Sequence, residues 1–138
     1  MDHAQNFLVN IDVPDLEAAT RFYTQAFALR VGRRFAEPWV ELIGGNAPIY
    51  LLETKPGSEA APHASRRTYE RHWTPVHLDF VVPEIDTAVQ SALDAGAKLE
   101  SAPVELPYGK LAVLSDPFGH GFCLIEFNGQ GYDALPTR

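Results

Sequence analysis

The stretch Val13-Pro14-Asp15-Leu16-Glu17-Ala18-Ala19 returns, with conservative changes, as Val82-Pro83-Glu84-Ile85-Asp86-Thr87-Ala88 in the second half of the chain. Each copy comes after an apolar run and precedes a helix-like stretch, so the repeated unit is longer than the quoted residues. An internal repeat decides the architecture before any local pattern does. The 138 residues therefore divide into two similar halves, and each position can be compared with its counterpart.

The residues before each Val-Pro alternate as expected for a β-strand with one face on a core. The apolar face carries Phe7, Val9, Ile11 and Val13 in the first half and Val76, Leu78, Phe80 and Val82 in the second. The opposite face carries Leu8, Asn10 and Asp12 in the first half and His77, Asp79 and Val81 in the second. This second face is the more polar one in both halves.

A helix and three further strands are expected after each of these first strands. Asp15 is a suitable N-cap for the first helix, and Gly96 a suitable C-cap for the second. The further strands are predicted near 30–36, 38–43, 48–54, 98–106, 109–115 and 120–127. Asp116-Pro117-Phe118-Gly119 predicts a turn before the last of them, because Pro presets φ at the second position and Gly tolerates a tight backbone at the fourth.

Each half is therefore predicted to be a βαβββ module. One small sheet with one helix buries little apolar surface, so the modules are expected to share a core in an α+β domain with a curved mixed-sheet cup. We assign the whole chain, 1–138, to this domain. Its parts are module one (6–54), a linker (55–72), module two (73–128) and a C-terminal tail (129–138). The linker is rich in Pro, Gly, Ser, Ala and Arg, which fits either a surface connection or a flap above a site.

Composition restricts the partners. The net charge of −7 disfavours nucleic acid, which binds basic surfaces. No apolar run is long enough to cross a bilayer, and the N-terminal residues lack the pattern of a signal peptide. The single cysteine, Cys123, excludes an internal disulfide and is expected to be a buried apolar residue. These features predict a cytoplasmic protein that acts on a small molecule.

Polar side chains on the open faces point to a pocket. Asn10, Asp12 and Asp79 face away from the expected core, and buried polar groups need partners, water or a ligand. Glu53 and Glu126 end the last strand of each module after a four-residue apolar run. By alternation, Glu53 shares a face with Ile49 and Leu51, and Glu126 with Phe122 and Leu124.

His77, Glu53 and Glu126 are the candidate metal ligands. Imidazole and carboxylate together suit Zn²⁺, Fe²⁺, Mn²⁺, Ni²⁺ or Co²⁺. Three protein ligands would leave coordination positions open for water and substrate. The alternative for His77 is a strand histidine that is simply hydrogen-bonded.

Several stretches also carry a family resemblance. They are Val13-Pro14-Asp15-Leu16, His77-Leu78-Asp79-Phe80-Val81-Val82, Gly96-Ala97, Asp116-Pro117-Phe118-Gly119-His120 and Ile125-Glu126-Phe127. Together with the repeat, they resemble the vicinal oxygen chelate superfamily over most of the chain. This superfamily holds glyoxalase I, extradiol dioxygenases, methylmalonyl-CoA epimerase, fosfomycin-modifying enzymes and bleomycin-resistance proteins. The resemblance implies paired βαβββ modules, usually in a homodimer.

The resemblance also implies where a metal would bind. In metal-dependent members the ligands come from the first and last strands of each module. The first-strand position falls on His77 in module two and on Leu8 in module one, and Leu8 cannot bind a metal. The last-strand positions are matched to Glu53 and Glu126. Three of the four positions therefore carry a ligand-type side chain.

Two functions are expected on these grounds. The first is a glyoxalase-like lyase or isomerase, or a dioxygenase, acting on a small oxygenated carbonyl compound. In it a metal would bind the substrate oxygens and Glu53 or Glu126 would move a proton. The second is a metal-free ligand-binding or bleomycin-resistance-type protein. In that case aromatic residues would stack on the ligand, with Phe35, Trp39, Trp73 and Tyr108 as the candidates.

Overall fold

A computed structural model describes residues 5–138, which fold into two compact units. The first unit holds the described residues up to Thr24 together with Ala28–Tyr69. The second unit holds Gln25–Phe27 and Glu70–Arg138. No helix among the described residues is both long and apolar enough to span a membrane.

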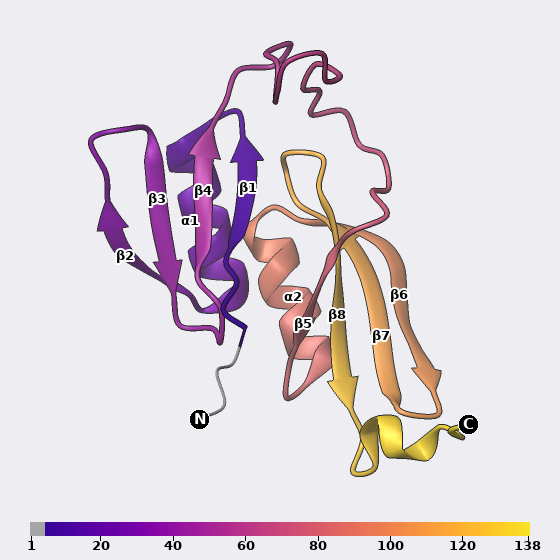
Figure 1. Ribbon diagram of the computed structural model, residues 1–138. Helices are drawn as coiled ribbons and strands as arrows, with labels where there is room; N and C mark the ends of the chain where they lie inside the picture. The colour runs from indigo at the N-terminus through magenta and orange to yellow at the C-terminus, as the bar shows by residue number, and fades with distance from the viewer. Residues whose placement is uncertain (1–4) are drawn as a thin grey trace. The chain divides into compact units, whose positions relative to one another are not determined.

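The first unit contains a four-stranded mixed sheet with a helix on one face (Figure 1). Its strand order is β1-β4-β3-β2, with β1 parallel to β4 and the other neighbours antiparallel. The elements are β1 (Val9–Val13), α1 (Leu16–Phe27), β2 (Arg30–Arg34), β3 (Trp39–Ile43) and β4 (Ile49–Glu53).

The second unit repeats this plan. Its strand order is β5-β8-β7-β6, again with one parallel pair at the same place. The elements are β5 (Leu78–Val81), α2 (Ile85–Ala95), β6 (Lys98–Leu106), β7 (Gly109–Ser115), β8 (Gly121–Phe127) and a closing 3₁₀ turn, η1 (Gly131–Ala134). The α+β class and the two βαβββ modules predicted from the repeat are therefore confirmed.

The helices begin and end where the sequence predicts. The Asp15 side chain accepts a 3.0 Å hydrogen bond from the Ala18 N–H and caps α1. Glu84 caps α2 in the same way. Gly96 ends α2 with a φ of +116°, which a residue without a Cβ adopts at little cost.

Alternation divides the first sheet into two faces with different tasks. The side chains on the α1 side are buried, and they include Val40, Leu42, Ile49 and Leu51. Their neighbours on β3 and β4 face away from the helix, as do the matching residues of β1. Register places Tyr50 of β4 between Asn10 of β1 and Glu41 of β3, so these three side chains lie side by side on the open face.

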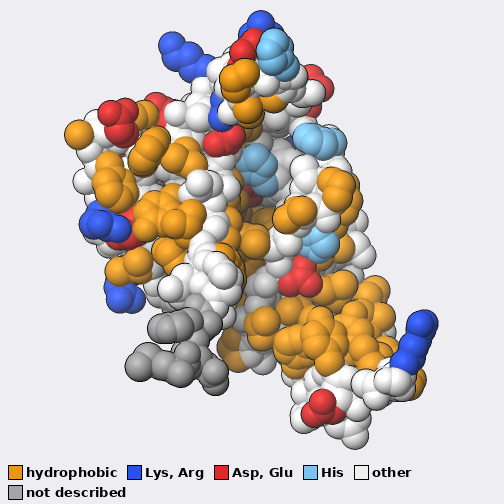
Figure 2. Space-filling model, viewed as in Figure 1, with side chains coloured by type: hydrophobic (Ala, Val, Ile, Leu, Met, Phe, Trp, Pro, Cys, Tyr) orange, Lys and Arg blue, Asp and Glu red, His pale blue; other side chains and the backbone are white. Residues whose placement is uncertain are grey.

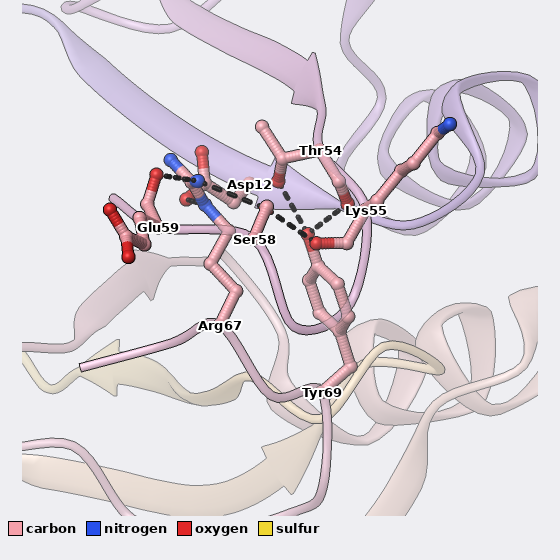
Figure 3. Close-up of polar contacts among 7 residues, drawn as sticks. All are labelled: Asp12, Thr54, Lys55, Ser58, Glu59, Arg67 and Tyr69. Atoms are coloured by element: carbon pink, nitrogen blue, oxygen red, sulfur yellow. Dashed lines mark hydrogen bonds and ion pairs between the residues drawn. The ribbon is translucent and has the colours of Figure 1, made fainter. Parts of the chain in front are cut away.

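The linker folds against the end of the first sheet (Figure 3). The Arg67 guanidinium donates a 2.7 Å hydrogen bond to Asp12 and a second, of 2.9 Å, to the carbonyl of Glu59. The Tyr69 hydroxyl donates to the Thr54 carbonyl at 2.7 Å. The part of the linker within the first unit is thus an ordered loop with its own polar contacts.

Candidate functional site

The two glutamates predicted as metal ligands each contact the start of a helix. The Glu53 carboxylate accepts a 3.0 Å hydrogen bond from the Leu16 N–H, and the Glu126 carboxylate accepts one of 2.8 Å from the Ile85 N–H. Leu16 and Ile85 are the first residues of α1 and α2, whose N–H groups have no partner within the helix. Both glutamates therefore lie on the helix side of their sheets.

The second sheet does not bring His77 together with Glu126. β5 and β8 pair with Asp79 opposite Cys123, so His77, Asp79 and Cys123 share the face away from α2. Glu126 belongs to the other face. The predicted pairing of His77 with Glu126 thus conflicts with strand alternation.

His77 has a different set of neighbours. One donor atom from each of His77, Asp79 and Cys123 lies within 4.8 Å of the others, and His77 Nε2 is 3.1 Å from Asp79 Oδ1. The Trp73 ring lies over the imidazole, with 4.5 Å between ring centroids. Burial raises the pKa of the Cys123 thiol to about 11, and the adjacent Asp79 carboxylate adds to the rise. Imidazole, carboxylate and thiolate are ligand types that fit a divalent transition metal, provided that the thiol loses its proton.

The open face of the first sheet carries a pocket of about 290 Å³. Figure 2 shows hydrophobic side chains gathered over this sheet, with charged groups beside them. All four strands of the sheet, the residue before β1 and the residue after β2 supply the lining, which consists of Leu8, Asn10, Arg33, Phe35, Trp39, Tyr50 and Leu52.

Aromatic rings form much of this lining. The centroids of Phe35 and Trp39 are 6.4 Å apart, and those of Phe35 and Tyr50 are 6.3 Å apart. The Trp39 side chain is 43% exposed although it lies in a concave surface. Exposed aromatic faces in a pocket are suited to stacking against a flat ligand.

A polar network lies beneath the rings. Arg33 donates to both carboxylate oxygens of Glu41, at 2.9 Å from Nε and 2.6 Å from Nη2, and the Tyr50 hydroxyl donates at 2.8 Å. These hydrogen bonds, those of Arg33 above all, lower the pKa of Glu41 to about 2. A Cβ at Gly32 would lie 2.6 Å from Glu41 Oε1, so a side chain there would displace the Glu41 carboxylate from its present position.

The predicted pocket residues divide between several places. Asn10 and Trp39 line the pocket of the first unit. Asp12 lies at the edge of the same sheet but is bound by Arg67. In the second unit, Asp79 lies beside His77, and Tyr108 packs 5.0 Å from the Tyr132 ring.

Sequence reasoning missed the polar network. Glu41 stands between Val40 and Leu42 in a predicted strand, and that placement was the available signal. A charged residue between two buried ones must face the other side of the sheet. Nothing in the sequence identified Arg33 or Tyr50 as its partners, because both contacts depend on strand register.

Comparison with known proteins supports the predicted resemblance. Residues 8–125 match the model of a family described as a glyoxalase-like domain. The chain belongs to this family. The resemblance to the vicinal oxygen chelate superfamily is thereby confirmed.

Two curated relatives of this glyoxalase-like chain are named for anthracycline biosynthesis. The protein DauV of Streptomyces sp. (strain C5) is 26% identical over 129 residues, which are 91% of this chain and 42% of that protein. DnrV of Streptomyces peucetius is 36% identical over 93 residues, which are 67% of this chain and 32% of that protein. The chain thus spans less than half the length of either relative.

Solved structures share the glyoxalase-like fold. A glyoxalase/bleomycin resistance protein/dioxygenase family enzyme from Burkholderia phytofirmans PsJN is 26% identical with a TM-score of 0.68, covering 88% of this chain and 97% of its own. The fosfomycin resistance protein FosX from Listeria monocytogenes is 16% identical with a TM-score of 0.70, covering 94% and 98%. A variant of that FosX, complexed with Mn(II) and dihydroxypropylphosphonic acid, is 16% identical with a TM-score of 0.69, covering 94% of both chains.

Proposed function

We propose that this glyoxalase-like protein binds a flat aromatic small molecule in the pocket of its first unit. The observation that carries the proposal is the exposed Trp39 ring, which shares the pocket with Phe35 and Tyr50. A large aromatic side chain left partly in water gains free energy when a ligand ring covers it. Each stacked aromatic pair contributes about 0.5–1.5 kcal/mol beyond the burial of its area.

The curated relatives support this ligand class. Both are named for the biosynthesis of anthracyclines, compounds that contain fused aromatic rings. The pocket volume of about 290 Å³ lies at the lower end of the range for ligand pockets, roughly 300–1,000 Å³. The pocket would therefore hold part of such a polycycle and leave the remainder outside it.

The two tryptophans of the chain offer a matched test. Trp39 is 43% exposed and Trp73 is 46% exposed, but only Trp39 lines the pocket. Calorimetric titration with quinizarin, a dihydroxyanthraquinone, should give saturable binding to the wild type and to Trp73→Ala. Binding to Trp39→Ala should fall by about tenfold or more. Equal affinities of wild type and Trp39→Ala would overturn the proposal, as would loss of binding in Trp73→Ala alone.

Metal-assisted chemistry of the glyoxalase type is the second candidate function. The observation that favours it is the convergence of His77, Asp79 and Cys123, supported by the Mn(II) complex of a protein with the same fold. These residues would hold the metal in place of the predicted set of Glu53, His77 and Glu126. A bound divalent metal would polarise vicinal oxygens of a carbonyl substrate. The Cys123 thiol would release its proton to solvent when the metal binds, and Asp79, the only carboxylate in the cluster, would hold the metal beside it.

Metal titration separates the two ligand sets. Protein prepared without a polyhistidine tag should bind Zn²⁺ or Mn²⁺ in calorimetry and lose that binding in His77→Ala and Asp79→Ala. Glu126→Gln should bind the metal as the wild type does. Loss of metal binding in Glu126→Gln, with the fold intact, would instead support the set predicted from the sequence.

A further inference from the structure

Arg33 occupies a fixed position at the edge of the aromatic pocket. Its Nε and Nη2 atoms donate to the two oxygens of Glu41, which is the paired geometry that a guanidinium and a carboxylate form best. The hydrogen bonds to Glu41 use Nε and Nη2 and leave the Nη1 donors outside the pair, and the side chain is 66% exposed. The guanidinium also lies 5.2 Å from the centroid of the Phe35 ring. It therefore retains free donors next to an aromatic surface.

Glu41 holds Arg33 in this position and is itself unavailable to a ligand. Its side chain is only 11% exposed. One oxygen accepts from Arg33, and the other accepts from both Arg33 and the Tyr50 hydroxyl. A cationic ligand would have to displace these donors, so the acidic group does not make the pocket a cation site. The negative net charge of the whole chain therefore does not predict that this pocket prefers a cationic ligand.

Asn10 supplies a second polar group on the other side of Tyr50. Strand register pairs Asn10 with Tyr50 and Tyr50 with Glu41, so Asn10 lies on one side of Tyr50 and Glu41, which binds Arg33, lies on the other. Both side chains line the pocket. An amide both donates and accepts hydrogen bonds, whereas the free guanidinium N–H groups only donate.

We infer that the pocket selects aromatic ligands that carry ring oxygens, of the phenol or quinone class, and that Arg33 is the residue that recognises the oxygen. This inference rests on the proposed function, since it takes the ring to lie on Trp39. The free N–H groups of Arg33 donate to a carbonyl or phenolic oxygen at the ring edge. Because the guanidinium is already oriented by Glu41, little side-chain freedom is lost on binding.

Three probes of similar ring size test the selection. They are quinizarin, which carries ring oxygens, anthracene, which carries none, and the cationic acridine dye proflavine. The wild type should bind quinizarin most tightly of the three. Tighter binding of anthracene or proflavine would overturn the inference.

A double substitution tests the role of Arg33 without leaving a buried charge unpaired. Arg33→Met combined with Glu41→Leu removes both charges and keeps the volume, and circular dichroism checks its fold. Its affinity for quinizarin should fall by about tenfold, the effect of losing one charge-assisted hydrogen bond. Its affinity for anthracene should stay unchanged. If the ratio of the affinities for quinizarin and anthracene were the same in the double variant and the wild type, the inference would be overturned. If the double variant does not fold, Arg33→Lys serves instead and should weaken quinizarin binding alone.

The two proposals fail in different ways. If Trp39→Ala binds every probe as the wild type does, the ring does not lie in this pocket and the proposed function fails. If Trp39→Ala lowers the affinity for all probes equally while the double variant keeps the ratio of their affinities, the pocket is correct and the role of Arg33 is wrong.

Discussion

The carboxylate of Glu126 accepts a hydrogen bond of 2.8 Å from the backbone N–H of Ile85, the first residue of α2. Glu53 does the same for Leu16 in α1. The last strand of each module thus carries, at its last residue in β4 and one residue earlier in β8, an acidic group that caps the helix that comes after the first strand. A negative charge at a helix N-terminus is also favoured by the helix dipole. Helix capping therefore explains why a glutamate occurs at the matched place in both modules, a feature that had suggested metal binding.

Replacing Glu126 by Ala should lower the free energy of unfolding by about 1–2 kcal/mol, because the Ile85 N–H loses its partner. Glu126→Gln should cost less, since the amide oxygen can still accept the hydrogen bond. Urea unfolding followed by circular dichroism measures both. Glu53→Ala is the internal control and should show a loss of similar size. A Glu126→Ala variant as stable as the wild type would contradict the capping role.

The site was harder to predict than the fold, and Glu126 explains why. Alternation in the sequence already placed Glu126 with Phe122 and Leu124, and His77 with Asp79. The structure shows that the face of Glu126 packs on the helix and that His77 and Asp79 lie on the other face. The residue types of His77 and Glu126 suggested a shared site, but alternation along the strands places their side chains on opposite faces of the sheet. A helix cap by a distant strand leaves no mark in local sequence, because it depends on tertiary packing.

Acid should weaken the polar network of the pocket. The pKa of Glu41 is lowered from 4.5 to about 2, first by Arg33 and then by Tyr50. Because the pKa is lower in the folded state, the stabilisation is complete above about pH 4.5 and is lost as the pH falls toward 2. The stability difference between wild type and Glu41→Gln should therefore shrink over this range. A constant difference, measured by urea unfolding at several pH values, would show that Glu41 is not ionised in the network.

Cys123 should react slowly with alkylating agents in the native protein. Its pKa of about 11, raised by burial and then by Asp79, keeps it protonated at pH 8. Iodoacetamide should modify the folded chain on the order of a hundredfold more slowly than the urea-unfolded chain. Mass spectrometry reports a single site, because the chain has only one cysteine. Equal rates in the two states would contradict the burial of the thiol.

Arg67 should control the order of the linker. Arg67→Ala removes the ion pair with Asp12 and the hydrogen bond to the Glu59 carbonyl. Partly exposed ion pairs contribute about 1 kcal/mol or less, so global stability should change little. Cleavage of the linker by proteinase K should nevertheless become faster. Arg66→Ala is the comparison variant. Arg66 is 68% exposed, and its 3.6 Å ion pair with Glu59 and 2.9 Å hydrogen bond to the Gly57 carbonyl stay within the linker, so the cleavage rate should rise less than in Arg67→Ala.

The fold could be predicted from the sequence because its evidence is local and occurs twice. Strand alternation, the Asp15 and Gly96 caps and the turn at Asp116 each have a short-range cause, and the two modules confirm one another. The pocket could be predicted only in part. Asn10 was predicted from its strand face, and Phe35 and Trp39 were predicted as stacking residues, whereas the Arg33–Glu41–Tyr50 network needed three strands in register.

The division of β3 and β4 into a core face and a pocket face has a consequence for how this protein can change. Val40 and Leu51 are buried on the helix side, while their neighbours Trp39 and Leu52 line the pocket. Apart from the Arg33–Glu41–Tyr50 network, substitutions on the pocket face of β3 and β4 can therefore accumulate without disturbing the packing on the helix. A library that varies only the pocket face should yield many folded members with new ligand preferences, which offers a route by which one scaffold diverges into many binding proteins.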